Sequence, residues 1–194
     1  MDAKTSSDKF TYAINAIFYC MWRFEVSSSN RLKNIFIWLA TFIPQYFYSD
    51  ESKKRFFERY NQSIREYDKA RYNRKYGEHI GMTKHNFGCL YSSYPAIISF
   101  MLMGLFFVIF GLESKGSLLY LIIVALPIGI GYIPAYKALY TKDRYLAYFK
   151  MFDKEDNNWY RRWKCRTILF IIGSIVSTIV GCALLFGILV FFRA

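Results

Sequence analysis

The second half of this chain lacks charged side chains over three long stretches, residues 94–112, 117–136 and 167–192. None of these runs contains Asp, Glu, Lys, Arg or His. An α-helix rises about 1.5 Å per residue, so each run spans roughly 28 to 39 Å, against a hydrocarbon core of about 30 Å. The absence of charge predicts an integral membrane protein. It also disfavours ion-coupled transport and intramembrane proteolysis, which place ionisable groups at depth.

Recognisable catalytic and metal-binding motifs are absent as well. No glycine-rich phosphate loop is followed by Lys and Ser or Thr, and no Ser, His and Asp set has a nucleophile elbow. The spacing of His79, His85 and Cys89 matches no compact zinc signature. No two of the four cysteines form a C-x-x-C pair; they are Cys20, Cys89, Cys165 and Cys182. We therefore predict no disulfide framework, metal, cofactor or catalytic residue.

What the chain has in excess is positive charge, 26 Lys and Arg against 14 Asp and Glu. Fifteen of the cations precede residue 94, and nine lie within residues 137–166. Cytoplasmic segments of membrane proteins carry such an excess. This predicts a multi-pass protein of the plasma or inner membrane, with the N-terminus cytoplasmic and residues 113–116 and the C-terminus outside. Anionic lipid headgroups are the expected partner rather than nucleic acid, because the cations lie beside the spans among acids and aromatics.

Residues 1–49 contain two shorter uncharged runs, 10–22 and 35–48, which residues 25–34 connect. Both fall short of the ~17 residues that cross a bilayer comfortably. Their Trp and Tyr content suits the headgroup zone, so we predict two interfacial or re-entrant helices. The alternative is that both span, which gives five crossings. A signal peptide is disfavoured, because Trp22 and the residues after it stand where small residues should mark a cleavage site.

Residues 50–93 are predicted to form a basic amphipathic cytoplasmic helix, residues 50–76, and a glycine-rich loop, residues 77–93. Asp50 and Glu51 suit the positive end of the helix dipole. Apolar side chains then recur at steps of three and four residues, at Phe57, Tyr60, Ile64 and Tyr67.

Residues 94–136 are predicted to form a transmembrane hairpin, with Pro95 in the first turn and residues 113–116 as the connection. Pro127 and Pro134 each remove a backbone hydrogen bond from the second span, which predicts a kink. Residues 137–166 follow as a basic, aromatic cytoplasmic segment. Within it, residues 136–152 should continue the helix, residues 153–158 should break it, and Asn158 should cap the last helix.

A cluster of aromatic and cationic residues directly precedes the last span, residues 167–194. We expect its rings in the interface and its cations at lipid phosphates; it comprises Trp159, Arg161, Arg162, Trp163, Lys164 and Arg166. Within the span, Gly173, Ser177 and Gly181 are four residues apart, a spacing that lets helices approach closely. Packing against the first two spans is the expected use, and self-association or a partner is the alternative. The same four-residue spacing of small residues occurs one position further along the span, at Ser174, Thr178 and Cys182.

Taken together, the sequence predicts an all-α membrane protein with three transmembrane helices, two N-terminal interfacial helices and a cytoplasmic amphipathic helix. The expected function is that of a non-enzymatic accessory, assembly or interaction protein, whose basic layer binds headgroups or a protein partner. One alternative is a pore or small transporter formed by oligomers around the kinked second span. Another is an enzyme that acts on lipid through His79 or His85.

Overall fold

A computed structural model describes the backbone of residues 3–47, 50–111 and 117–193, and most side chains within those ranges. The described residues form helices and no strand. In chain order the elements are α1 (Ala3–Phe47), α2 (Asp50–Arg71), α3 (Glu78–Phe110), α4 (Ser117–Leu139), the short 3₁₀ helix η1 (Thr141–Asp143), α5 (Arg144–Phe152) and α6 (Asn157–Arg193). The predicted turn at residues 113–116 lies outside the described residues.

The chain divides into two compact units. Unit 1 comprises residues 1–19 and 86–194, and therefore holds the start of α1, most of α3, and all of α4, α5 and α6. Unit 2 comprises residues 20–85, which form the rest of α1, α2 and the start of α3.

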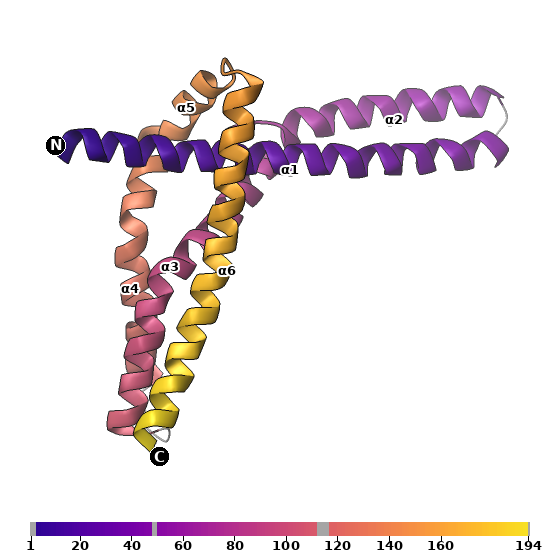
Figure 1. The fold of residues 1–194 in the computed structure, drawn as a ribbon. Coiled ribbons are helices and arrows are strands. Elements are labelled where there is room, and N and C mark those ends of the chain that lie inside the picture. The colour runs from indigo at the N-terminus through magenta and orange to yellow at the C-terminus, as the bar shows by residue number, and fades with distance from the viewer. Residues whose placement is uncertain (1–2, 48–49, 112–116, 194) are drawn as a thin grey trace. The chain divides into compact units, whose positions relative to one another are not determined.

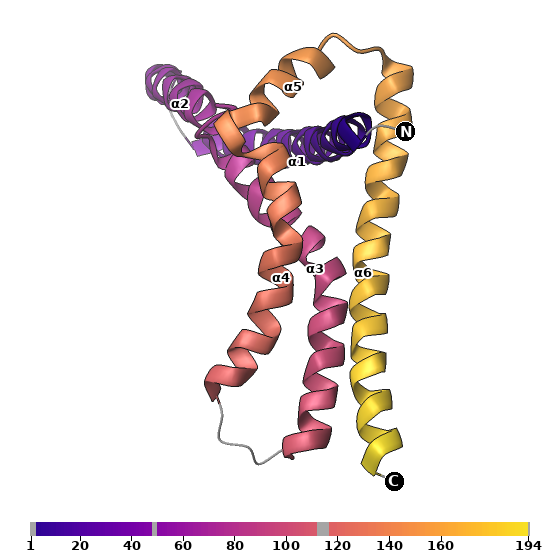
Figure 2. The same ribbon diagram turned by 90° about the vertical axis from the view of Figure 1, so that its left-hand side faces the viewer.

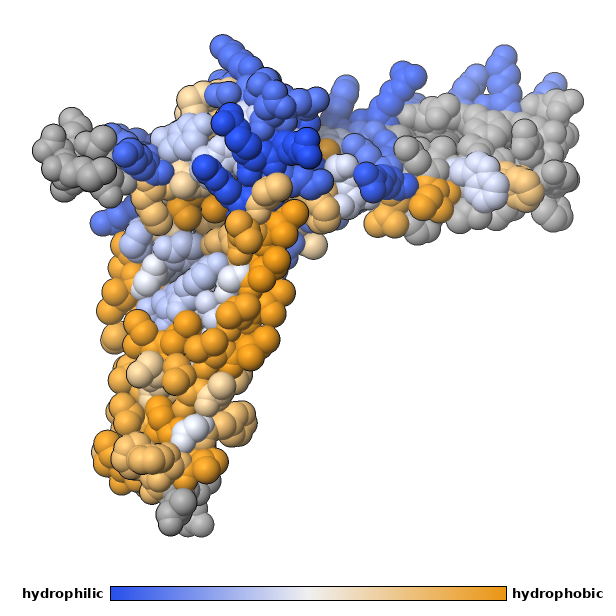
Figure 3. Space-filling model, in the orientation of Figure 1, coloured by the Kyte–Doolittle hydropathy of each residue, from blue (hydrophilic) through white to orange (hydrophobic). Residues whose placement is uncertain are grey.

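Unit 1 holds the predicted membrane-crossing segments. Among the described residues, three helical stretches are long and apolar enough to cross a membrane: Glu78–Phe110, Leu118–Phe152 and Asn157–Phe192. Figures 1 and 2 show α3, α4 and α6 running alongside one another. Their outward surface is apolar (Figure 3), and Leu121 and Ile179, for example, are 65% and 62% exposed. The prediction of three helices long and apolar enough to span a membrane is therefore confirmed.

The N-terminal prediction of two separate short helices is wrong, because α1 is continuous from Ala3 to Phe47. Residues 25–34, expected as a connection, contain neither Gly nor Pro and so have nothing that breaks a helix. The residues of the first run do not lie on an open surface either. Ile14, Phe18 and Tyr19 are each at most 5% exposed, because other helices of unit 1 cover them.

The predicted loop at residues 77–93 is also wrong, since α3 begins at Glu78 and runs through it. Pro95 consequently lies inside α3 rather than in its first turn. A glycine in a helix costs only about 1 kcal/mol relative to Ala, and burial of apolar side chains outweighs that cost. Ile80 and Phe87, which occupy this stretch, are 1% and 0% exposed.

The predicted continuous helix over residues 136–152 is interrupted after Leu139. Lys142 and Asp143 adopt left-handed backbone conformations, with φ of 55° and 51°, so the chain turns before α5 begins. The turn leaves the carbonyl of Ala138 without its helical partner. The Nδ2 of buried Asn15 on α1 donates to that carbonyl at 3.1 Å and so caps the end of α4.

The start of α6 also differs in detail from the prediction. Asp156, not Asn158, caps this helix, since its Oδ1 accepts a hydrogen bond from the backbone N–H of Trp159 at 2.7 Å.

Buried rings from α1, α3, α5 and α6 form the core of unit 1. Phe18 contacts Phe87 and Tyr145 edge-on, with ring centroids 5.6 and 5.7 Å apart. Tyr19 contacts Phe149 at 5.1 Å, and its hydroxyl donates to Asp153 at 2.9 Å. Each such ring pair contributes about 0.5–1.5 kcal/mol beyond area burial. This aromatic core attaches the first helix of the chain to the last ones.

Unit 2 is a hairpin of the C-terminal part of α1 and α2 (Figure 1). Lys33 pairs with Asp68, and the Tyr72 hydroxyl bonds Asn30, so the two helices run antiparallel. A helix is therefore present in the predicted segment and ends at Arg71 rather than at residue 76. The side chains of its predicted apolar stripe, Phe57, Tyr60, Ile64 and Tyr67, lie outside the described residues.

Candidate membrane-interface sites

The first turns of α6 carry a group of exposed cations on a buried aromatic base. Trp159 and Trp163 are 6% and 8% exposed. The Trp159 Nε1 donates to the Tyr12 hydroxyl at 2.9 Å, and its ring stacks on Phe152 at 4.7 Å. Tyr12 and Phe152 thus supply a protein environment for Trp159, and the location of the two Trp rings at the membrane interface stays a prediction.

The cations of this segment point outward and are called here the cationic turn: Arg161, Arg162, Lys164 and Arg166. The Arg166 guanidinium lies over the Trp163 ring at 4.5 Å, so one member of the cationic turn rests on the aromatic base. Within the next turn the surface becomes apolar, with Leu169 67% exposed. Because α6 is one continuous helix, the distance between the cations and the apolar span is fixed by backbone geometry.

The small residues of α6 face α3. A Cβ added to Gly173 would lie 2.6 Å from the Tyr94 hydroxyl, and one added to Gly181 would lie 2.4 Å from the Phe100 ring. The hydroxyls of Ser174 and Ser93, which flank these contacts, share a hydrogen bond of 2.6 Å. Ser177 is buried on the same helix. Close approach of α6 to α3 therefore occupies this face.

The prolines Pro127 and Pro134 lie inside α4. The Ser99 hydroxyl of α3 donates to the carbonyl of Val124 at 2.9 Å, in the turn that Pro127 disrupts. A neighbouring hydroxyl is one of the usual ways to satisfy backbone groups near a proline in a membrane helix.

The histidines do not form a shared site. His79 is buried against the Tyr72 ring at 5.0 Å, and burial lowers the pKa of its imidazole below the ordinary 6.5. His85 and Cys89 are exposed. Within the described part of the chain, no three His, Cys, Asp or Glu side chains are placed to hold a metal ion.

Unit 2 carries an exposed apolar surface that extends beyond the second uncharged run. We call it the apolar stripe of α1; its members, 45–64% exposed, are Phe24, Leu32, Ile35, Trp38 and Phe42. At 100° per residue they fall within about 120° of the helix circumference. Phe24 and Leu32 were missed because they lie outside that run, although helical periodicity carried across residues 25–34 would have found them.

The chain matches no protein-family model, no curated protein and no solved structure.

Proposed function

We propose that this protein is a non-enzymatic membrane accessory protein, in which unit 1 is the anchor and unit 2 is an interaction arm. The observation that carries the proposal is the apolar stripe of α1. Contiguous exposed apolar side chains on a polar helix hairpin are a marker of a surface that contacts lipid or protein. Its residue types favour a membrane surface as the contact of α1, and the charged side chains of α2 are then available to a protein partner.

The composition of the apolar stripe supports a lipid contact. Trp38 stacks on Phe42 with ring centroids 5.5 Å apart, and Trp, whose ring has a polar N–H edge, is enriched at headgroup level. Arg31 is exposed within the same arc, where its stem can lie along apolar surface while the guanidinium reaches a phosphate. Figure 3 displays apolar side chains along the α1 edge of the hairpin. An interfacial helix has these features.

The side chains of α2 support a different role for that helix. Its described members are largely exposed and mix both signs of charge, as at Lys54, Arg55, Glu58 and Arg59. A mixed-charge helix gains little from burial in lipid and remains in water, where it can recognise a complementary protein surface. The Lys and Arg excess before residue 94 favours the cytoplasmic side for this hairpin.

Site-specific photocross-linking in native membranes tests both halves of the proposal. A benzophenone amino acid at Trp38 is expected to form adducts with phospholipid, and one at Glu58 to form adducts with a protein. Protein adducts alone at position 38 would show that the apolar stripe binds a protein and would refute the membrane contact. Failure of either position to form any adduct would refute the interaction arm.

Deletion of residues 53–76 provides the second test. The accessory role predicts that the partner captured through position 58 is no longer recovered, while the three spans still insert. Insertion is measured by resistance of the shortened chain to carbonate extraction. Full recovery of the partner with the deleted chain would contradict the assigned role of α2.

A further inference from the structure

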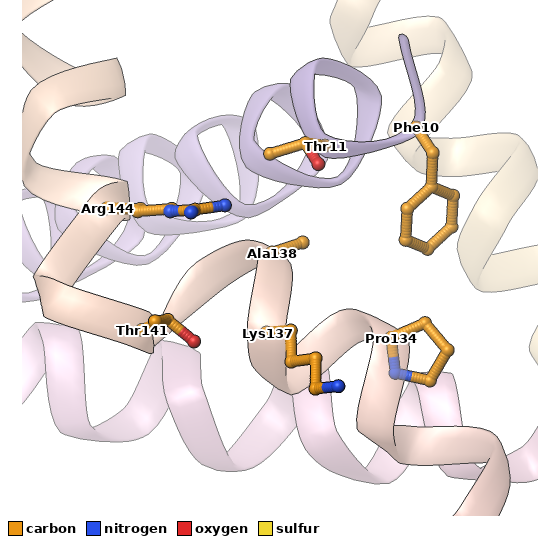
Figure 4. Close-up of a pocket in the computed structure, with 7 residues that line it drawn as sticks. All are labelled: Phe10, Thr11, Pro134, Lys137, Ala138, Thr141 and Arg144. Carbon is orange, nitrogen blue, oxygen red and sulfur yellow. The ribbon is translucent and has the colours of Figure 1, made fainter. Parts of the chain in front are cut away.

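Unit 1 contains a cavity of about 400 Å³ between α1 and the turn that joins α4 to α5. Figure 4 shows its lining side chains, which are Phe10, Thr11, Pro134, Lys137, Ala138, Thr141 and Arg144. The volume falls within the ~300–1,000 Å³ of small-ligand sites. The proposed function, which rests on unit 2, does not involve this cavity.

The polar lining of the cavity is suited to an oxyanion. Lys137 and Arg144 provide two cations, and Thr11 and Thr141 provide two hydroxyls. Among the residues that the structure describes, no carboxylate lines the cavity. A guanidinium offers paired N–H donors that match phosphate oxygens, and an ammonium adds a compact positive charge. A phosphate group, with several acceptor oxygens and negative charge, fits this donor set.

The two cations lie on either side of the turn between α4 and α5. Lys137 lies in the last turn of α4, and Arg144 opens α5. Between them Lys142 and Asp143 adopt left-handed conformations, each of which costs roughly 1–2 kcal/mol for a residue other than glycine. A continuous helix, as the sequence predicted, would separate these two Cα atoms by about 10 Å along its axis. In this structure both residues line the same cavity beside the turn.

One wall of the cavity is apolar and continues along α4. Phe10 and Pro134 lie together on the side opposite Arg144 (Figure 4). Ile130 and Ile133, at 61% and 47% exposure, precede Pro134 and Lys137 by one helical turn on the same face. An exposed apolar track therefore leads from the cavity along the spanning part of α4.

The cavity lies at the end of the uncharged part of α4. Lys137 is the first charged residue after the uncharged run 117–136, so it stands where α4 leaves the hydrocarbon. A ligand with a phosphate group in the cavity and a hydrocarbon chain along Ile130 and Ile133 would match both the cationic lining and the apolar track. We infer that the cavity binds the phosphate of an anionic phospholipid, with an acyl chain along this face of α4.

Native mass spectrometry of the full-length protein in detergent tests this site. Phosphatidylglycerol and phosphatidylcholine with identical acyl chains serve as probes, and the protein is expected to bind the former more tightly. In the variant with Lys137→Gln and Arg144→Gln this preference should fall by about tenfold or more, equivalent to about 1.4 kcal/mol. The matched control, Lys150→Gln with Lys154→Gln, removes the same charge from exposed positions outside the cavity and should keep the preference.

Equal losses in the two double variants would overturn the site, because general attraction to the basic surface would then explain binding. An unchanged preference in the cavity variant would overturn it as well. A second arm separates lipid from free phosphate: Ile133→Asn should weaken phosphatidylglycerol binding, and excess inorganic phosphate should displace the lipid only partly. Complete displacement by inorganic phosphate, with normal binding by Ile133→Asn, would assign the cavity to soluble phosphate and refute the lipid.

Discussion

Two glycines of α4, two residues apart, offer a direct test of the packing between α3 and α4. A Cβ added to Gly131 would lie 2.5 Å from the Cβ and 2.9 Å from the Cγ of Pro95 on α3. A Cβ added to Gly129 would meet nothing within 4 Å. Carbon atoms prefer separations of about 3.5–4.0 Å, so Gly131→Ala must move the helices apart by roughly 1 Å. The proline ring is fixed to its own backbone and has no rotamer that avoids the clash.

The expected magnitude follows from two opposing effects. Overpacking costs about 1–3 kcal/mol, and replacing a helical glycine by alanine returns up to about 1 kcal/mol of helix propensity. Both variants share the propensity gain, so their difference isolates the clash. Gly131→Ala should be less stable than Gly129→Ala by about 1–3 kcal/mol, a melting-temperature gap of roughly 3–9 °C in a chain of this size. Thermal unfolding in detergent, followed by circular dichroism, measures the gap. Equal melting temperatures would refute the close contact of α3 and α4 at this level.

Three further substitutions probe other parts of the fold. Asn15→Leu should lower stability by about 1–3 kcal/mol in the same melting assay, because the buried carbonyl of Ala138 loses its donor; an unchanged melt would contradict the capping role. Because burial lowers the pKa of His79, unit 2 keeps its full stability above pH 6.5 and loses part of it as the pH falls below that value. The hydrogen-exchange protection of residues 71–85, measured relative to the intrinsic exchange rate at each pH, should therefore fall at pH 5, and His79→Phe should abolish that fall. Gly77→Ala would place a Cβ 2.4 Å from two backbone carbonyl oxygens and should increase exchange in the same residues at pH 7.5, whereas Gly81→Ala, with nothing within 4 Å, should not.

Helix boundaries were harder to predict than the membrane-crossing runs. Glycines at positions 77, 81 and 88 indicated a loop, yet burial of Ile80 and Phe87 outweighs a cost of about 1 kcal/mol per glycine. The opposite error occurred after Leu139, where no residue in the local sequence signals that the helix stops. At this stop the Ala138 carbonyl accepts a hydrogen bond from Asn15, which is 123 residues away in the chain.

The candidate sites also include features that the sequence predicted and features that it did not. The cationic turn of α6 was visible as a charge pattern, and its side chains are exposed. The burial of Trp159 could not be predicted from the sequence, because the residues that cover it, Tyr12 and Phe152, belong to other helices. The cavity between α1 and the α4–α5 turn could not be predicted, since its lining combines Phe10 and Thr11 of α1 with residues more than 120 positions later in the chain.

Membrane compatibility was readable from the chain alone, because transfer into lipid is additive over side chains and depends little on their neighbours. The uneven distribution of Lys and Arg was likewise readable from the sequence alone. The aromatic core, the uninterrupted α1, the break between α4 and α5 and the cavity beside that break were decided by tertiary contacts. Each of them requires groups far apart in sequence to satisfy one another, and a local pattern contains no record of such distant partners.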